Sequence, residues 1–225
     1  MAIQLEEVEP TSRGARRRIW TRERLIEAAR TVVARQGIDD TTIADITNAA
    51  DVGIGSFYNH FESKEHLVET LVAQAIETYG AALDCMVAPL SDPAEIFATC
   101  VRHTMRMADH DPVWAWFTVR AGFYVRELES GLGVRLLRDL GRGIESGRFT
   151  PGDVRSALVV IGGAVVAAMQ GRLLGVRDLP ADHLIAEQLL RMLGVPADEA
   201  ERIASLPLAE PLLETAHSSA PGGNR

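Results

Sequence analysis

The sequence has few of the residues that mark several common classes of protein. Only two of its 225 residues are cysteine, Cys85 and Cys100. Two are too few for a disulfide framework, and they favour reduced thiols packed as small apolar side chains over a redox pair. The longest uninterrupted apolar run, 157–169, is shorter than the ~20 residues that a membrane-spanning helix needs, and the acidic first residues do not form a secretory signal. We therefore expect a cytoplasmic protein without a membrane-spanning segment.

Motifs for catalysis and for cofactor binding are also lacking. The sequence has no P-loop, no dinucleotide fingerprint and no nucleophile elbow. His103, Asp109 and His110 do not have the spacing of a helical metal site. Asp111, beside them, is better explained as the cap of a helix that starts at Pro112. We expect no enzyme activity, no catalytic residue, no metal site and no cofactor.

Lysine is nearly missing, because arginine supplies all but one of the 23 basic residues and Lys64 is the exception. The net charge of -8 argues against indiscriminate binding of polyanions by the whole molecule. The basic residues are nevertheless gathered, since 13–35 holds eight arginines against only Glu23 and Glu27. One basic segment therefore lies on an otherwise acidic protein.

Helical periodicity is what the chain does have. It is 47% hydrophobic and 24% charged, which is ordinary for a protein that forms a core, and no segment alternates like a strand. We expect an all-α fold of about nine or ten helices. A flexible basic arm (1–18) would precede a first domain (19–66), a second helical domain (67–205) and a disordered tail (206–225) rich in Pro, Ser and Gly.

Capping residues and prolines indicate where the helices begin. Thr21 predicts the start of the first helix and Gly37 its end. Thr41 or Thr42 would cap the second helix, and Ser63 would cap a long helix over 64–88. Later starts are marked by a capping residue followed by proline, at Asp92-Pro93, Asp111-Pro112 and Thr150-Pro151. The further expected helices cover 93–108, 112–121, 124–146, 152–174, 181–193 and 197–205.

Residues 41–67 read as two short helices joined by a tight turn at 51–53, followed by the start of the long helix. This is the pattern of a helix-turn-helix, whose second helix enters the major groove of DNA by its N-terminal residues. That helix, 54–60, presents Ile54, Gly55 and Ser56 first and then Tyr58, Asn59 and His60. Tyr58 and His60 can donate hydrogen bonds to phosphate, Asn59 can read a base edge, and Gly55 allows close approach of the backbone. Val52, Phe57 and Phe61 would pack inward.

Lys64 stands at the first position of the long helix, where the positive end of the helix dipole disfavours a cation. A cation at this position indicates an anionic partner close by, and a DNA phosphate would serve.

At these residues the chain resembles the TetR family of bacterial transcriptional regulators. The resemblance covers about residues 20–68, and the rest is similar only in being helical. Asp51, Gly53 and Thr47 depart from the family pattern at a turn glycine, a serine and an alanine. The matching positions are Thr42-x-x-x-Ile46, Ala50-x-Val52 and Gly55-Ser56-Phe57-Tyr58-x-His60-Phe61-x-Ser63-Lys64-Glu65-x-Leu67.

The resemblance implies a homodimer that binds a palindromic operator in double-stranded DNA. It also implies a ligand pocket in the C-terminal domain, coupled to the DNA through the long helix. We expect a repressor released by a small, largely apolar effector, with activation left open. Carried over by position, Thr42, Tyr58, His60 and Lys64 would hold phosphates, and Ile54, Ser56 and Asn59 would face bases. Arg18, with Arg16 and Arg17, is either a further DNA contact or part of a solvated charge run.

The region 103–124 gathers most of the aromatic residues, and it is either a ligand pocket or ordinary core. The candidate ligand-binding residues are His103, Met107, Trp114, Phe117, Arg120, Phe123 and Tyr124, with His103 and Arg120 as polar orienting groups. The helices expected at 152–174 and 181–193 are the candidate dimer interface. The first of them is apolar all round, so it must be buried on every side, either by a second subunit or inside the monomer.

A second hypothesis is a helical small-molecule-binding protein or enzyme without specific DNA binding. It is weakened by the dense match over 41–67 and by the lack of a catalytic constellation. A gel shift with DNA from around the protein's own gene separates the two hypotheses.

Overall fold

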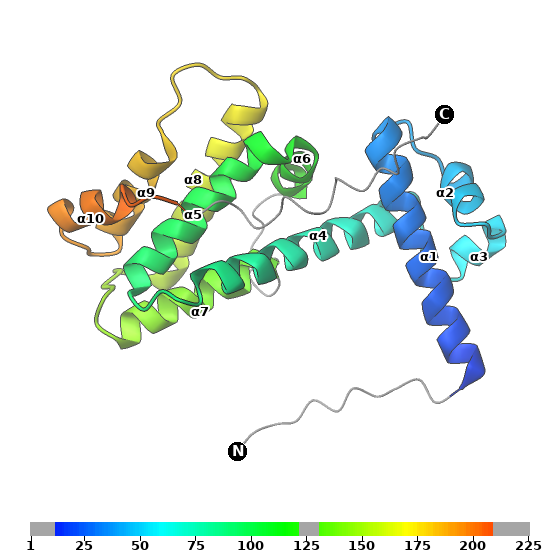
Figure 1. Cartoon of the computed structure of the whole chain (residues 1–225), viewed down its shortest axis with the longest axis horizontal. Coiled ribbons are helices and arrows are strands. Elements are labelled where there is room, and N and C mark those ends of the chain that lie inside the picture. Colours follow the sequence, from blue (N-terminus) through cyan, green and yellow to red (C-terminus); the bar gives the residue numbers. More distant parts are fainter. Residues whose placement is uncertain (1–11, 122–130, 209–225) are drawn as a thin grey trace, which may run out of the picture. The chain divides into compact units, whose positions relative to one another are not determined.

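The computed structural model describes residues 12–121 and 131–208, which form ten helices and no strand (Figure 1). The predicted all-α fold is confirmed. Two compact units divide the chain, 1–73 and 74–225, and the division falls inside one long helix. The helices are α1 (Arg13–Gln36), α2 (Ile43–Ala49), α3 (Ile54–Tyr58), α4 (Lys64–Val87), α5 (Pro93–His110), α6 (Pro112–Ala121), α7 (Gly131–Glu145), α8 (Val154–Leu173), α9 (Asp182–Met192) and α10 (Ala197–Ala204).

Helix α1 begins at Arg13, so the prediction that it starts at Thr21 is wrong. Ser12 is the N-cap, and its hydroxyl accepts a hydrogen bond from the Ala15 amide at 3.1 Å. Arginine and alanine favour the helix, so nothing stops it from extending back to this earlier cap. The Thr21 hydroxyl instead donates to the Arg17 carbonyl within the helix at 2.9 Å. Part of the predicted arm is therefore helical, and residues 1–11 lie outside the described residues.

The first unit has a small core made by α1, α2, α3 and the start of α4. Apolar residues one turn apart on α1 meet the inward faces of the two short helices, as the helical period requires. Phe57, the one buried residue of α3, anchors that helix, and Phe61 lies against it with ring centroids 5.7 Å apart. The buried members are Leu25, Ile26, Ala28, Ala29, Ile46, Ala50, Phe57, Phe61 and Leu67.

The second unit is built around α5, which contacts α6, α7, α8, α9 and α10. The predicted caps on both sides of it are confirmed. The Asp92 carboxylate accepts from the Ala94 amide at 2.9 Å, and the Asp111 carboxylate accepts from the Trp114 amide at 2.9 Å. Arg102 is buried in α5 and donates to Asp182 at 2.8 Å, which joins α5 to the first turn of α9. The predicted helix 124–146 is observed only as α7, because 122–130 lie outside the described residues.

Helix α8 begins two residues later than predicted. Asp153 caps it by accepting from the Ser156 amide at 2.7 Å, and Thr150 instead donates its amide to the Leu193 carbonyl. Gly152 is a poor helix former, which explains why the helix does not start at Pro151. Among the described residues, α8 alone is long and apolar enough to cross a membrane by length and composition.

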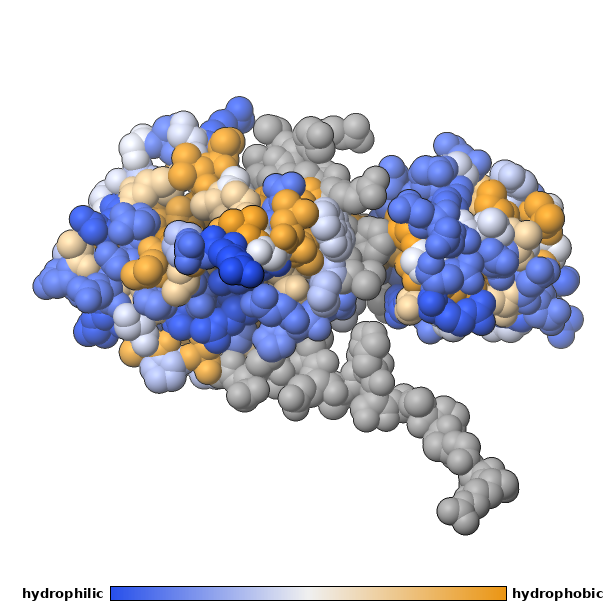
Figure 2. Space-filling model, turned by 90° about the horizontal axis from the view of Figure 1, so that it is seen from above, coloured by the Kyte–Doolittle hydropathy of each residue, from blue (hydrophilic) through white to orange (hydrophobic). Residues whose placement is uncertain are grey.

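The expectation that α8 is buried on every side is not met by the single chain. One face packs into the core through Leu158, Ile161 and Met169, while Val159 and Val160 on the other face are exposed. Figure 2 shows apolar patches among hydrophilic residues on the face of each unit that it draws.

Ion pairs fasten α4 to α7 within the second unit. Arg135 donates to Glu77 at 2.6 Å and to Asp84 at 2.8 Å, and Arg138 donates to Asp84 at 2.7 Å. Gly80 makes this possible, since a Cβ there would collide with the Arg135 guanidinium. The two guanidinium groups lower the pKa of Asp84 against the opposing effect of its partial burial, so the carboxylate stays ionised.

Candidate nucleic-acid interface

The helix-turn-helix is fixed by local hydrogen bonds. Thr42 caps α2 in a reciprocal capping box, in which its hydroxyl accepts from the Asp45 amide at 3.2 Å and Asp45 accepts from the Thr42 amide at 3.0 Å. Asp51 takes a left-handed conformation with a φ of 50°, which aspartate tolerates better than most residues. The Val52 amide donates a hydrogen bond to the Thr47 carbonyl at 3.0 Å, which closes the turn. Gly53 gives α3 no side-chain cap.

The predicted recognition residues lie on the outer side of α3. Ile54 and Tyr58 are 54% and 58% exposed, which is unusual for large apolar side chains in a folded unit. Gly55 and Asn59 are exposed, while Ser56 and His60 are half-buried. A Cβ on Gly55 would meet nothing within 4 Å, so the surface there is open. Buried Phe57 holds the helix in place and leaves these groups free to meet a partner.

Lys64 has intramolecular partners that the sequence did not indicate. Its ammonium group donates to the Ile38 carbonyl at 3.1 Å and to the Thr41 carbonyl at 3.0 Å. The lone lysine therefore ties the start of α4 to the loop between α1 and α2. An ammonium group has three hydrogens, so one donor remains. Ser63 caps α4, as predicted, by accepting from the His66 amide at 3.2 Å.

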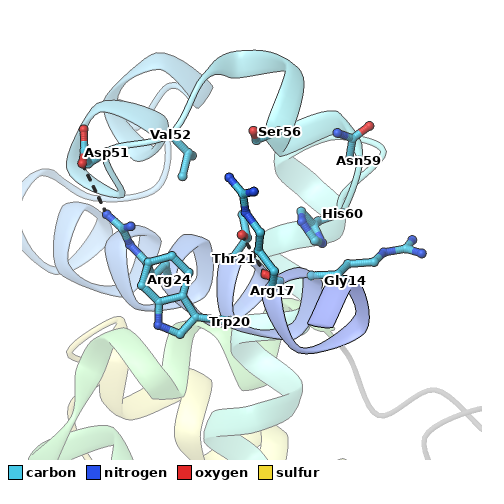
Figure 3. Close-up of a pocket in the computed structure, with 11 residues that line it drawn as sticks. Gly14, Arg17, Trp20, Thr21, Arg24, Asp51, Val52, Ser56, Asn59 and His60 are labelled. Carbon is cyan, nitrogen blue, oxygen red and sulfur yellow. Dashed lines mark hydrogen bonds and ion pairs between the residues drawn. The ribbon is translucent and has the colours of Figure 1, made fainter. Parts of the chain in front are cut away.

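An open groove of about 760 Å³ runs between the N-terminal half of α1 and the α3 region (Figure 3). Sequence reasoning missed most of its α1 wall because it placed the start of that helix too late. The α1 wall consists of Gly14, Arg17, Arg18, Trp20, Thr21 and Arg24, and the opposite wall consists of Asp51, Val52, Ser56, Asn59 and His60.

Arg24 is held within this groove by two neighbours. Its guanidinium carbon lies 4.5 Å from the centroid of the Trp20 ring, and its Nη2 atom lies 3.8 Å from the Asp51 carboxylate. His60, on the α3 side, has its pKa lowered from the ordinary value by burial first and then by the positive charges of Arg18 and Arg22. At neutral pH the imidazole is therefore uncharged, so it can donate one hydrogen bond and accept another.

The candidate ligand residues that can be placed lie in the second unit. His103, Met107 and Trp114 are buried, and the Trp114 ring lies 4.8 Å from that of Tyr79. Neither His103 Nε2 nor Trp114 Nε1 has a hydrogen-bond partner among the described residues. Burial lowers the pKa of His103 to about 4, so the side chain is neutral. The side chains of Phe117 and Arg120, and the whole of Phe123 and Tyr124, lie outside what the structure describes.

The described cysteines and acidic residues give little indication of a reactive thiol or of a metal site. Cys85 is exposed, and burial raises the pKa of the Cys100 thiol to about 12, which disfavours the reactive thiolate. No group of three or more His, Cys, Asp or Glu side chains is placed to hold a metal within the described ranges.

Two family models match the chain. The model described as "Bacterial regulatory proteins, tetR family" matches residues 25–71, and the one described as "Tetracyclin repressor-like, C-terminal domain" matches residues 92–206. The first of these spans the helix-turn-helix, and the second covers most of the second unit.

Curated relatives are similar over shorter stretches. The chain is 34% identical over 80 residues to the transcriptional repressor KstR2 of Mycolicibacterium smegmatis, covering 34% of this chain and 39% of that protein. It is 50% identical over 44 residues to the transcriptional repressor DhaR of a Mycobacterium species, covering 20% of this chain and 22% of that protein. The chain thus spans less than half the length of these relatives.

Solved structures match over a greater length. The crystal structure of RolR in complex with resorcinol is 42% identical with a TM-score of 0.76, covering 88% of this chain and 99% of that chain. FadR from Bacillus subtilis, in complex with stearoyl-CoA, is 21% identical with a TM-score of 0.58, covering 78% of this chain and 98% of that chain, and shows only the shared fold. From its family matches and from its likeness to RolR, this chain belongs to the TetR family of bacterial regulatory proteins.

Proposed function

We propose that this protein is a dimeric transcriptional repressor that binds a palindromic operator and leaves it when a small effector binds. The observation that carries the proposal is the outer face of α3, where exposed side chains stand on a helix anchored by buried Phe57. Relatives named as repressors support the direction of regulation.

In this proposal the residues of the helix-turn-helix have separate tasks. Ile54, Ser56 and Asn59 face bases, and Gly55 allows the α3 backbone to come close to the groove. Tyr58, His60 and the third donor of Lys64 hold phosphates. Thr42 is less free for this task, because its hydroxyl hydrogen already goes to the Asp45 carboxylate at 2.6 Å. Its main contribution is to fix the start of α2.

The proposed dimer interface is the open face of α8 with the neighbouring surface of α9. Val159 and Val160 are 56% and 49% exposed in the single chain, and Leu184 on α9 is 46% exposed. Gly163 and Ala167 continue the same α8 face at intervals of three and four residues, and both of these small residues are exposed. Such a stripe allows a second copy to approach closely and removes the apolar surface from water.

For the effector we propose a small hydroxylated aromatic compound. The similar protein RolR was crystallised with resorcinol, a compound of this kind. In this chain, His103 Nε2 and Trp114 Nε1 are buried without a partner among the described residues, and a phenolic hydroxyl can both donate to a neutral imidazole and accept from an indole N–H. Tyr79 and Met107 supply apolar contact beside Trp114. An effector acts only through its differential affinity for the two states, so it should weaken operator binding by the factor by which operator weakens effector binding.

The test is fluorescence anisotropy with labelled DNA from the region upstream of the protein's own gene, titrated with resorcinol as the probe. Preferential binding followed by release is expected. Trp114→Phe removes only the buried N–H and one ring, and should raise the concentration for half-release by roughly tenfold, the equivalent of one hydrogen bond. Trp116→Phe is the matched control, because Trp116 lies on the same helix and is exposed. Binding of resorcinol without preference for any nearby promoter would favour a small-molecule-binding protein instead.

A further inference from the structure

The groove between α1 and α3 is a basic surface that lies mostly outside the family match. That match begins at residue 25, whereas the α1 wall of the groove is made by residues 14–24. The first half of α1, residues 13–24, carries six arginines and one acidic residue, Glu23. This wall is therefore a feature of this chain that the helix-turn-helix match does not account for.

The arginines of the wall share one face of the helix. Positions 14, 17, 18, 21 and 24 recur at intervals of three and four, so they stand above one another over two to three turns. From Arg17 to Arg24 the helix rises about 10 Å. Consecutive phosphates of one DNA strand advance by about 3.4 Å along the duplex axis, so a face of this length can meet more than one phosphate.

Charge in the groove favours an anion. Arg17 and Arg18 have exposed side chains and form no ion pair with residues in the described ranges. Asp51 is the sole carboxylate of the lining and is already engaged by Arg24. His60, on the opposite wall, has its pKa lowered first by burial and then by the positive charges of Arg18 and Arg22. Guanidinium groups bind phosphate oxygens in pairs of hydrogen bonds, a geometry that an extended polyanion can satisfy repeatedly.

The opposite wall identifies the polyanion. Ser56 and Asn59 are base-facing residues in the proposed function, and they line the same groove that Arg17 and Arg18 line from α1 (Figure 3). A strand whose bases meet α3 would have its backbone beside α1. Trp20, with 54% of its surface exposed, offers an apolar ring for the sugar next to Arg24.

We infer that the groove between α1 and α3 holds the DNA backbone adjacent to the bases that α3 reads, so that the first half of α1 is a second DNA-contact element. This inference depends on the proposed function and adds a surface to it. Arg17 and Arg18 bind phosphate, and Asp51 opposes binding through its charge.

The test measures operator affinity of the full chain as a function of salt concentration. The logarithm of the binding constant falls as the logarithm of salt concentration rises. Each phosphate contact that is lost should reduce the magnitude of this slope by about 0.9 and weaken binding roughly tenfold at 0.1 M salt. Arg17→Ala combined with Arg18→Ala should lower the slope by about 1 to 2 and weaken operator and unrelated DNA alike. Arg35→Ala, in the last turn of the same helix and outside the groove, should leave the slope unchanged.

A second variant tests whether removal of a negative charge from the groove strengthens DNA binding. Asp51→Asn removes the carboxylate while keeping a residue that tolerates the left-handed turn, so it should tighten binding of all DNA sequences. An unchanged slope in the double arginine variant, with wild-type protein that prefers its operator, would overturn the inference and leave the proposed function intact. A weakening confined to the operator would also overturn it, because that result indicates base readout. Absence of operator preference in the wild type would instead reject the proposed function.

Discussion

Replacing Lys64 by methionine should separate two roles of the lone lysine. The substitution keeps a long side chain but removes the ammonium group that donates to the Ile38 and Thr41 carbonyls. Hydrogen bonds from a charged donor contribute about 1.5 to 3 kcal/mol each when buried. Lys64 is half-buried and one ammonium serves both carbonyls, so we expect a loss of about 2 kcal/mol in total.

This loss should appear within the first unit, because the ammonium group joins α4 to the loop between α1 and α2. Hydrogen exchange followed by mass spectrometry resolves the two units in the intact chain. The protected amides of α2 should exchange roughly 30-fold faster, which corresponds to about 2 kcal/mol, while those of α5 stay unchanged. Glu62→Gln changes a neighbouring exposed charge without touching the two carbonyls and serves as the control.

DNA binding gives the second readout. If the remaining donor of Lys64 also holds a phosphate, Lys64→Met should lower the salt slope by about 0.9. Lys64→Arg keeps the charge but not the compact ammonium, so it should restore the slope more fully than the stability. Exchange of α2 at the wild-type rate in Lys64→Met would refute the reasoning that this lysine fastens the α1–α2 loop.

Three other outcomes are expected. Phe57→Ala removes the buried side chain that anchors α3 and should lower the stability of the first unit by about 3 to 5 kcal/mol. DNA binding should be abolished, while the exchange rates of α5 amides remain those of the wild type. Binding of phosphate should raise the pKa of His60, which burial and then the charges of Arg18 and Arg22 lower in the free protein, so DNA binding takes up a proton. Affinity should therefore increase as the pH falls from neutral through the bound-state pKa, and anisotropy at fixed salt should show no such increase in His60→Gln. Val160→Arg on the open face of α8 should yield a monomer in sedimentation, whereas Val176→Arg, equally exposed beyond the end of that helix, should not.

The helices and their caps were largely predictable from the sequence because each depends on residues close in the chain. The capping box of Thr42 joins residues three positions apart, and Asp92 and Asp111 cap the helices that follow them directly. Phe57 was expected to point inward because a helix of this period leaves it opposite the polar recognition residues. The start of α1 was missed because Ser12 and Thr21 are both acceptable caps, and local preference alone does not choose between them.

By itself the sequence determined that the chain is helical, where most helices begin, and that residues 41–67 form a helix-turn-helix. The hydrogen bonds of caps and the hydrophobic periods of helices involve residues that are close in the chain, so both can be recognised from the sequence. Tertiary structure decided which groups meet across long separations. Lys64 donates to carbonyls 26 and 23 positions away, and the arginines in the first half of α1 face Asn59 and His60 across a groove. One face of α8 remains exposed, whereas α5 is largely buried. Contacts of this kind depend on how helices pack, and packing is settled by all the apolar faces of a unit together.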